Sequence, residues 1–271
     1  MGVNDVSLTS GMRSNLLQLQ GTSKLIDRTQ ERLSTGKQVN SALDNPTNYF
    51  AAQSHVNRAN DFAVRKDGMA EGIQTATAAD AGISSINSLV EAAKGLAAAA
   101  LGTANTTDRA TFSTQYQQLI TQINTMASDS QYRGTNLLTG ATLTVNFNED
   151  ATSKLEVKGF TATATGLSIT TPTNLWTSDG EITNSQLHLA SATTQLRTQS
   201  KNLANNLNII TTRQDFTDQM IATLQTGADN LTLADMNQEG ANMLMLQTRQ
   251  NLGTTALSMS SQAAQSVLRL F

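Results

Sequence analysis

The sequence predicts a mainly α-helical fold, in which long helices form a hairpin or coiled-coil bundle interrupted by one small β-hairpin region. Apolar residues recur at heptad spacing near both ends of the 271-residue chain. Small and apolar residues repeat at helical spacing between residues 46 and 128, whereas strict alternation is confined to residues 141–172. Aromatic residues make up only 4% of the chain, which suits a thin bundle packed with Leu, Ile, Met and Ala.

Residues 1–36 are predicted to form the first helix of an inner coiled coil. The helix should begin near Ser10 and end at Gly36, because glycine commonly terminates helices. Its apolar residues recur at intervals of seven, and one leucine fills an intermediate position. These seam residues, which are predicted to pair with the C-terminal helix and with copies of this chain, are Met12, Leu16, Leu19, Ile26 and Leu33.

Residues 37–45 are a predicted irregular connector, and Pro46 opens the next helix. Proline is favoured in the first turn of a helix, and Asp44 or Asn45 can cap it. The helical periodicity then continues to Leu101, breaks at residues 102–107 and resumes over residues 108–128. Residues 46–140 therefore constitute a predicted N-terminal helical core.

Residues 141–182 are predicted to hold the β-hairpin region. Leu143 and Val145 alternate with polar residues, and Leu155 and Val157 do so after a loop. The period of two continues through the threonines at 161, 163 and 165, so β structure is expected to about residue 172.

Helix is predicted to resume over residues 183–231, as a C-terminal helical core, and again over residues 232–271, as the second inner coiled-coil helix. After Glu239 the chain carries only two charged residues, Arg249 and Arg269, so the last helix is poorly suited to lie in water. Its seam should therefore be covered by other molecules, including copies of this chain. The seam residues are Leu252, Ala256, Met259, Ala263, Val267 and Leu270.

Composition argues against several classes of function. Cysteine is absent and the two histidines are distant in sequence, so a catalytic zinc site and a cysteine nucleophile are not expected. We expect no enzyme activity and no cofactor. The net charge of −3 does not favour nucleic acid. The longest apolar run, residues 96–101, is too short for membrane insertion, and the N-terminus lacks an ordinary secretory signal. The chain is expected to be cytosolic or exported without a cleaved signal.

Several segments resemble the signature motifs of bacterial flagellin, the subunit of the flagellar filament. Residues 31–37 (Glu-Arg-Leu-Ser-Thr-Gly-Lys) and 40–45 (Asn-Ser-Ala-Leu-Asp-Asn) are similar to its N-terminal motif. Residues 131–138 resemble the turn that enters its β-hairpin region. Residues 234–236, 250–253 and 264–268 resemble its C-terminal pattern. The short middle is similar to short flagellins of the alphaproteobacterial type, so no outer domains are expected.

The resemblance implies a structural protein that self-assembles into the extracellular filament used for swimming. It also implies secretion through the flagellar type III export apparatus, delivery by a flagellin chaperone, and contact with the filament cap and hook–filament junction proteins. The terminal helices would form an inner tube, would be largely disordered in the monomer and would fold on assembly. A hook–filament junction protein of the same architecture is the open alternative, and a soluble coiled-coil adaptor is a second one.

A threonine-rich stretch follows the predicted hairpin. Flagellins are often O-glycosylated in this region, which makes these hydroxyls candidates for modification, although β propensity alone also explains threonine there. The candidates are Thr161, Thr163, Thr165 and Thr173.

Overall fold

The computed structural model describes residues 10–268, with side chains to residue 266. The chain divides into two compact units. One unit combines the segment that ends at Asn57 with the segment that starts at Thr223, and the other covers Arg58–Ala222. Long helices predominate in both, so the predicted mainly α-helical fold is confirmed.

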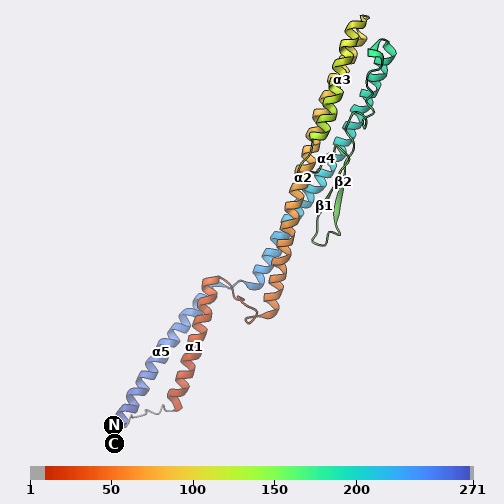
Figure 1. Ribbon diagram of the computed structural model, residues 1–271. Coiled ribbons are helices and arrows are strands. Elements are labelled where there is room, and N and C mark those ends of the chain that lie inside the picture. The colour runs from red at the N-terminus through yellow and green to blue at the C-terminus, as the bar shows by residue number, and fades with distance from the viewer. Residues whose placement is uncertain (1–9, 269–271) are drawn as a thin grey trace, which may run out of the picture. The chain divides into compact units, whose positions relative to one another are not determined.

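The first unit contains α1 (Ser10–Thr35) and α5 (Met236–Leu268), which lie side by side (Figure 1). The chain leaves α1 through Gly36, whose φ of 69° is a conformation that glycine adopts without strain. The backbones of the two connections are hydrogen-bonded to each other, because Ala234 N–H donates to the Gly36 carbonyl and Gln38 N–H to the Thr232 carbonyl. These bonds hold the adjoining ends of α1 and α5 together.

The second unit is built on α2 (Pro46–Leu101), α3 (Thr106–Asp129) and α4 (Asp179–Thr232), of which α2 and α4 also contribute residues to the first unit. Small residues dominate the buried positions at one end of α2, where Ala93, Ala97 and Ala100 are fully buried. Larger side chains from α3 and α4, such as Ile123 and Leu196, pack with them in one core. The predicted helix start at Pro46 and end near Leu101 are both correct.

The β-hairpin consists of β1 (Thr142–Asn146) and β2 (Lys154–Lys158), paired antiparallel with Val145 opposite Leu155. Val145 and Val157 are buried. The Val145 side chain packs over Gly72 of α2, where an added Cβ would lie 2.8 Å from Val145 Cγ2. A glycine in the helix interior is unfavourable in itself, and here it lets the strand approach α2 closely.

The prediction of β structure to about residue 172 is wrong. After an isolated bridge between Thr139 and Thr161, the chain forms turns, and Ser168 has a φ of 58°. Ala162 and Ala164 are buried while the neighbouring threonines are more exposed, which explains the alternation in the sequence. No described strand lies beside this segment, so the side chains alternate between buried and exposed without the hydrogen bonds of a β-sheet.

Hydroxyl groups on the helices bond back to their own backbone. Thr75, Thr121, Thr125 and Thr193, among others, each donate to the carbonyl four residues earlier. Such bonds satisfy a hydroxyl within a helix and slightly bend the helix.

Candidate assembly surfaces

One side of α1 forms a heptad stripe that packs on α5. Its less exposed residues are spaced by three and four, which is the spacing of a coiled-coil seam. The predicted residues Met12, Leu19, Ile26 and Leu33 all belong to this stripe. The intermediate positions are polar and were not predicted: they are Asn15, Thr22 and Thr29.

The facing stripe of α5 is also partly polar. Its members are less exposed than their neighbours on the helix, and we call them the inner stripe of α5: Glu239, Met243, Leu246, Gln250, Gly253 and Leu257.

Two contacts fix how the stripes pair. Leu19 fills the space above Gly253, because a Cβ there would lie 2.7 Å from Leu19 Cδ2. Arg32 Nη1 donates to Glu239 Oε1 at 3.0 Å, and the Glu239 side chain is only 8% exposed. Since the end of α1 thus meets the start of α5, the two helices run antiparallel.

The predicted C-terminal seam lies mainly on a different side of α5. Leu252 is 65% exposed and Met259 is 60% exposed, while Ala263 is also exposed and Ala256 is half-buried. Met245 continues this pattern one heptad earlier and is 46% exposed. We call Met245, Leu252, Met259 and Ala263 the outer face of α5. The side chain of Val267 and all of Leu270 lie outside the described residues.

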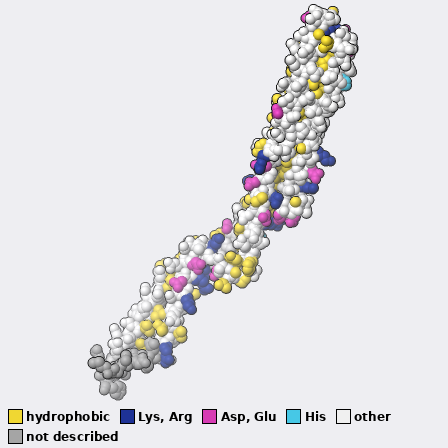
Figure 2. Space-filling view, in the orientation of Figure 1, with side chains coloured by type: hydrophobic (Ala, Val, Ile, Leu, Met, Phe, Trp, Pro, Cys, Tyr) yellow, Lys and Arg dark blue, Asp and Glu magenta, His cyan; other side chains and the backbone are white. Residues whose placement is uncertain are grey.

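In the structure, most of the predicted seam residues of α1 therefore pack on α5, whereas most of the predicted seam residues of α5 itself do not face α1. Leu16, the predicted intermediate residue, is 38% exposed and lies off the packed stripe. Leu17 and Leu25 of α1 are exposed as well, and Figure 2 shows hydrophobic side chains on the surface of this unit. Scattered apolar side chains are ordinary on a surface, whereas large contiguous apolar patches are typical of interaction sites.

The connector after α1 is held by one carboxylate. Asp44 Oδ2 accepts from the backbone N–H groups of Asn40 and Ser41 and from the Ser41 hydroxyl, at 3.0–3.1 Å. These bonds, led by the Ser41 backbone N–H, lower the pKa of Asp44. The carboxylate thus stays charged and shapes the turn that leads into α2.

The candidate modification residues differ in exposure. Thr161, Thr165 and Thr173 are exposed, and Thr163 is half-buried. The Thr163 hydroxyl accepts a hydrogen bond from the Gly166 N–H at 3.3 Å, so it is the least available of the four. The turn structure therefore presents three of the four candidate hydroxyls to solvent.

The described part of the chain offers no metal-binding cluster of three or more His, Asp or Glu side chains. No helix within residues 10–268 is both long and apolar enough to cross a bilayer.

Comparison with known proteins finds a matching family model and relatives that align with the full chain. The family model of the bacterial flagellin N-terminal helical region matches residues 3–142. Flagellin FljM of Caulobacter vibrioides is 30% identical over an alignment that covers 100% of both chains. A flagellin of Brucella melitensis is 30% identical over 97% of this chain and 98% of its own. The crystal structure of Bacillus cereus flagellin aligns with a TM-score of 0.49 and 20% identity, covering 55% of this chain and 88% of that one.

Proposed function

Because this chain belongs to the bacterial flagellin family of filament subunits, we propose that it polymerises through the outer face of α5 and the exposed leucines of α1. The observation that carries this proposal is the exposure of Leu252 and Met259 on a helix with almost no charge. Apolar side chains at heptad spacing gain free energy only when another molecule covers them, at about 25 cal/mol per Å² of apolar surface. In a homopolymer that molecule is a neighbouring copy.

The contact generates a filament because the two participating surfaces differ. A heterologous contact joins one patch of a subunit to another patch of the next, so it does not close on itself and propagates as a helix. Met12, Leu19, Ile26 and Leu33 hold α1 on α5 within a subunit, and the outer face of α5 faces the next subunit.

The same surfaces suit secretion by the flagellar export apparatus. The α1–α5 pair has Asn15, Thr22 and Thr29 in its seam, so its internal packing is weak and it can be opened for passage. A flagellin chaperone would cover the apolar outer face before export, and the filament cap and hook–filament junction proteins would meet it afterwards. The final location is the extracellular filament.

Electron microscopy of the purified full chain under polymerising conditions tests the filament role. We expect long filaments of uniform width. A protein that forms only short or closed oligomers would favour the hook–filament junction alternative or a soluble adaptor. Full-length similarity to flagellins favours the filament subunit.

Limited proteolysis distinguishes the free and assembled states. We expect mild protease to remove α1 and α5 from the monomer first, because a partly polar seam offsets little of the ordering entropy. In filaments the same helices should be protected. If α1 and α5 resisted protease equally well in a verified monomer and in filaments, assembly would have no role in ordering these helices.

We also propose Thr161, Thr165 and Thr173 as sites of O-linked modification, because their hydroxyls face solvent. Mass spectrometry of the protein from its native filament would detect the added mass on peptides that contain these residues. Unmodified peptides at all three positions would exclude the proposal.

A further inference from the structure

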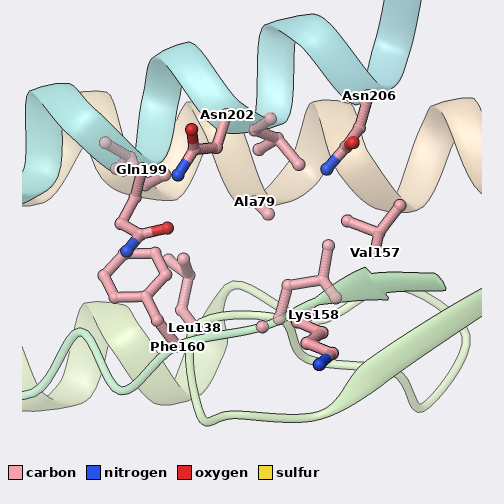
Figure 3. A pocket seen from close by; sticks show the side chains of 12 residues that line it. Ala79, Leu138, Val157, Lys158, Phe160, Gln199, Asn202 and Asn206 are labelled. Carbon is pink, nitrogen blue, oxygen red and sulfur yellow. The ribbon is translucent and has the colours of Figure 1, made fainter. Parts of the chain in front are cut away.

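A row of carboxamide side chains lines a groove beside the β-hairpin. Gln199, Asn202 and Asn206 project from α4 toward the segment that carries Phe160 and Lys158 (Figure 3). With Asn205, and with Glu156 and Lys158 of the opposite wall, they line an open groove of about 400 Å³. Among the described residues no hydrogen bond links any of these carboxamides to another group.

A second row lies on α3. Gln115, Gln118 and Gln122 line a surface groove of about 680 Å³ together with the apolar side chains of Leu96 and Leu119. All three glutamines are exposed, and their carboxamides also have no hydrogen-bond partner in the described part of the chain. Figure 2 shows few charged side chains over the end of the unit that contains α3.

The two rows match in spacing. Each has carboxamides at positions i, i+3 and i+7 of an α-helix, so both follow one helix face over about 10.5 Å. Each also has an apolar neighbour, which is Leu119 on α3 and the half-buried Phe160 beside α4.

The two rows match in chemistry as well. A carboxamide carries two donor hydrogens and one acceptor oxygen, so it can pair with another carboxamide through two hydrogen bonds. An apolar partner would leave several of these groups buried without a hydrogen bond, which is unfavourable. A partner that covers either row must therefore supply donors and acceptors together, and this chain carries such a row on another helix.

We propose that the carboxamide row of α3 in one subunit pairs with the carboxamide row of α4 in the next copy. This inference rests on the proposed filament function and assigns it a second, polar contact. The contact is heterologous, because it joins two different rows, and one chain offers both of them. Leu119 then packs near Phe160 of the neighbour, and the pairing of amides fixes the register along the two helices.

Disulfide trapping tests the contact directly, because the natural sequence has no cysteine. Subunits with Gln118→Cys are mixed with subunits with Asn202→Cys, polymerised under reducing conditions and oxidised with copper phenanthroline. We expect a disulfide-linked dimer, and mass spectrometry should join position 118 of one chain to position 202 of another. The matched control replaces Gln118→Cys by Gln117→Cys, which is exposed but does not line the α3 groove.

The outcomes separate the two proposals. Filaments whose cross-linking at 118–202 is no higher than in the 117–202 control would overturn the amide contact and leave the filament function intact. Failure of the unsubstituted chain to form filaments would overturn the filament function and this contact with it.

Charge substitution gives a second, independent test at the same positions. One variant carries Gln115→Glu, Gln118→Glu and Gln122→Glu on α3 together with Gln199→Glu, Asn202→Asp and Asn206→Asp on α4. The other keeps the three Glu substitutions on α3 but has Gln199→Lys, Asn202→Lys and Asn206→Lys.

We expect the acidic pair of rows to raise the critical concentration for assembly by about tenfold or more over the acidic–basic pair at low salt, because like charges repel across the contact. The difference should shrink as salt is added. Equal critical concentrations for the two variants, each with normal helical circular dichroism, would contradict the proposed contact.

Discussion

Arg109 shows how one side chain can join three parts of the second unit. It is 8% exposed, its Nε donates to the Thr103 carbonyl at 2.6 Å, and its Nη1 donates to the Thr177 carbonyl at 3.3 Å. Its Nη2 also pairs with the Asp179 carboxylate. The planar fork of a guanidinium reaches these acceptors at once, so the turn before α3 is tied to the first turn of α4.

Replacing Arg109→Lys should lower the free energy of unfolding by about 2 kcal/mol, since one ammonium group cannot reach all three acceptors and charge-assisted hydrogen bonds are lost. Denaturant unfolding followed by circular dichroism measures this. The matched substitution Arg197→Lys, at an exposed position of α4, should change stability by less than about 0.5 kcal/mol. Similar effects of both substitutions would show that the fork is unimportant.

Tyr116 gives the second unit a predictable response to alkaline pH. Its ring is fully buried, with its centre 4.8 Å from the ring centre of Trp176 and the two planes tilted by 55°, and burial raises the pKa of its hydroxyl to about 12. The unfolded chain loses this proton near pH 10 and the folded chain does not, so stability is present below pH 10 and declines as pH rises toward 12.

The Tyr116→Phe variant should lack this part of the alkaline loss, which reaches about 2–3 kcal/mol near pH 12. Urea unfolding of both proteins at pH 8 and at pH 11 measures it. The variant should lose less stability between the two pH values than the parent. An equal loss in both proteins would mean that Tyr116 does not titrate differently on unfolding.

At the scale of elements, the glycines of α2 have opposite roles that the sequence does not reveal. An added Cβ at Gly82 would collide with the Ser130 hydroxyl and with Leu138, whereas one at Gly95 would meet no atom within 4 Å. The first glycine permits close packing, and the second only weakens the helix.

We therefore expect Gly82→Ala to destabilise the protein by about 1–3 kcal/mol through overpacking. Its matched control Gly95→Ala should stabilise by about 0.5–1 kcal/mol through better helix propensity and a less flexible unfolded chain. Thermal unfolding of the two variants checks the signs. A gain in stability from Gly82→Ala would show that Ser130 and Leu138 move aside without cost.

The helix ends were predictable because proline and glycine act locally. Pro46 and Gly36 stand where α2 begins and α1 has just ended. The face of α5 that meets α1 was not predictable, because that face contains Gln250 and Gly253, which a count of apolar residues ignores. Gly253 belongs there because Leu19 needs its space. The prediction of β structure over residues 161–172 was wrong because burial alternates there without a partner strand.

At the scale of the whole molecule, the proposed assembly contact predicts different effects for a charge on each of the two sides of α5. Ile26→Asp would place a charge in the half-buried stripe between α1 and α5, whereas Met259→Asp would place one on the exposed outer face. An unpaired charge in an apolar contact costs several kcal/mol in practice, about 3 or more.

Met259→Asp should abolish filaments and leave the monomer's circular dichroism unchanged, whereas Ile26→Asp should also remove whatever helical signal the weakly packed α1–α5 pair contributes to the monomer. Electron microscopy and circular dichroism of each purified variant check both effects. Ser260→Asp, at an exposed polar position next to Met259, is the control and should still assemble. Normal filaments from Met259→Asp would remove the outer face of α5 from the subunit contact.

The hydroxyls that bond back to helix carbonyls also bear on mechanics. Where Thr75, Thr121, Thr125 or Thr193 donates to a carbonyl, that oxygen can accept hydrogen bonds from both the hydroxyl and the helical N–H. Small changes of helix curvature then exchange one bond for the other at little cost. A filament built from such subunits should bend through many minor distortions of its helices, spread along its length, and not at a few hinge points.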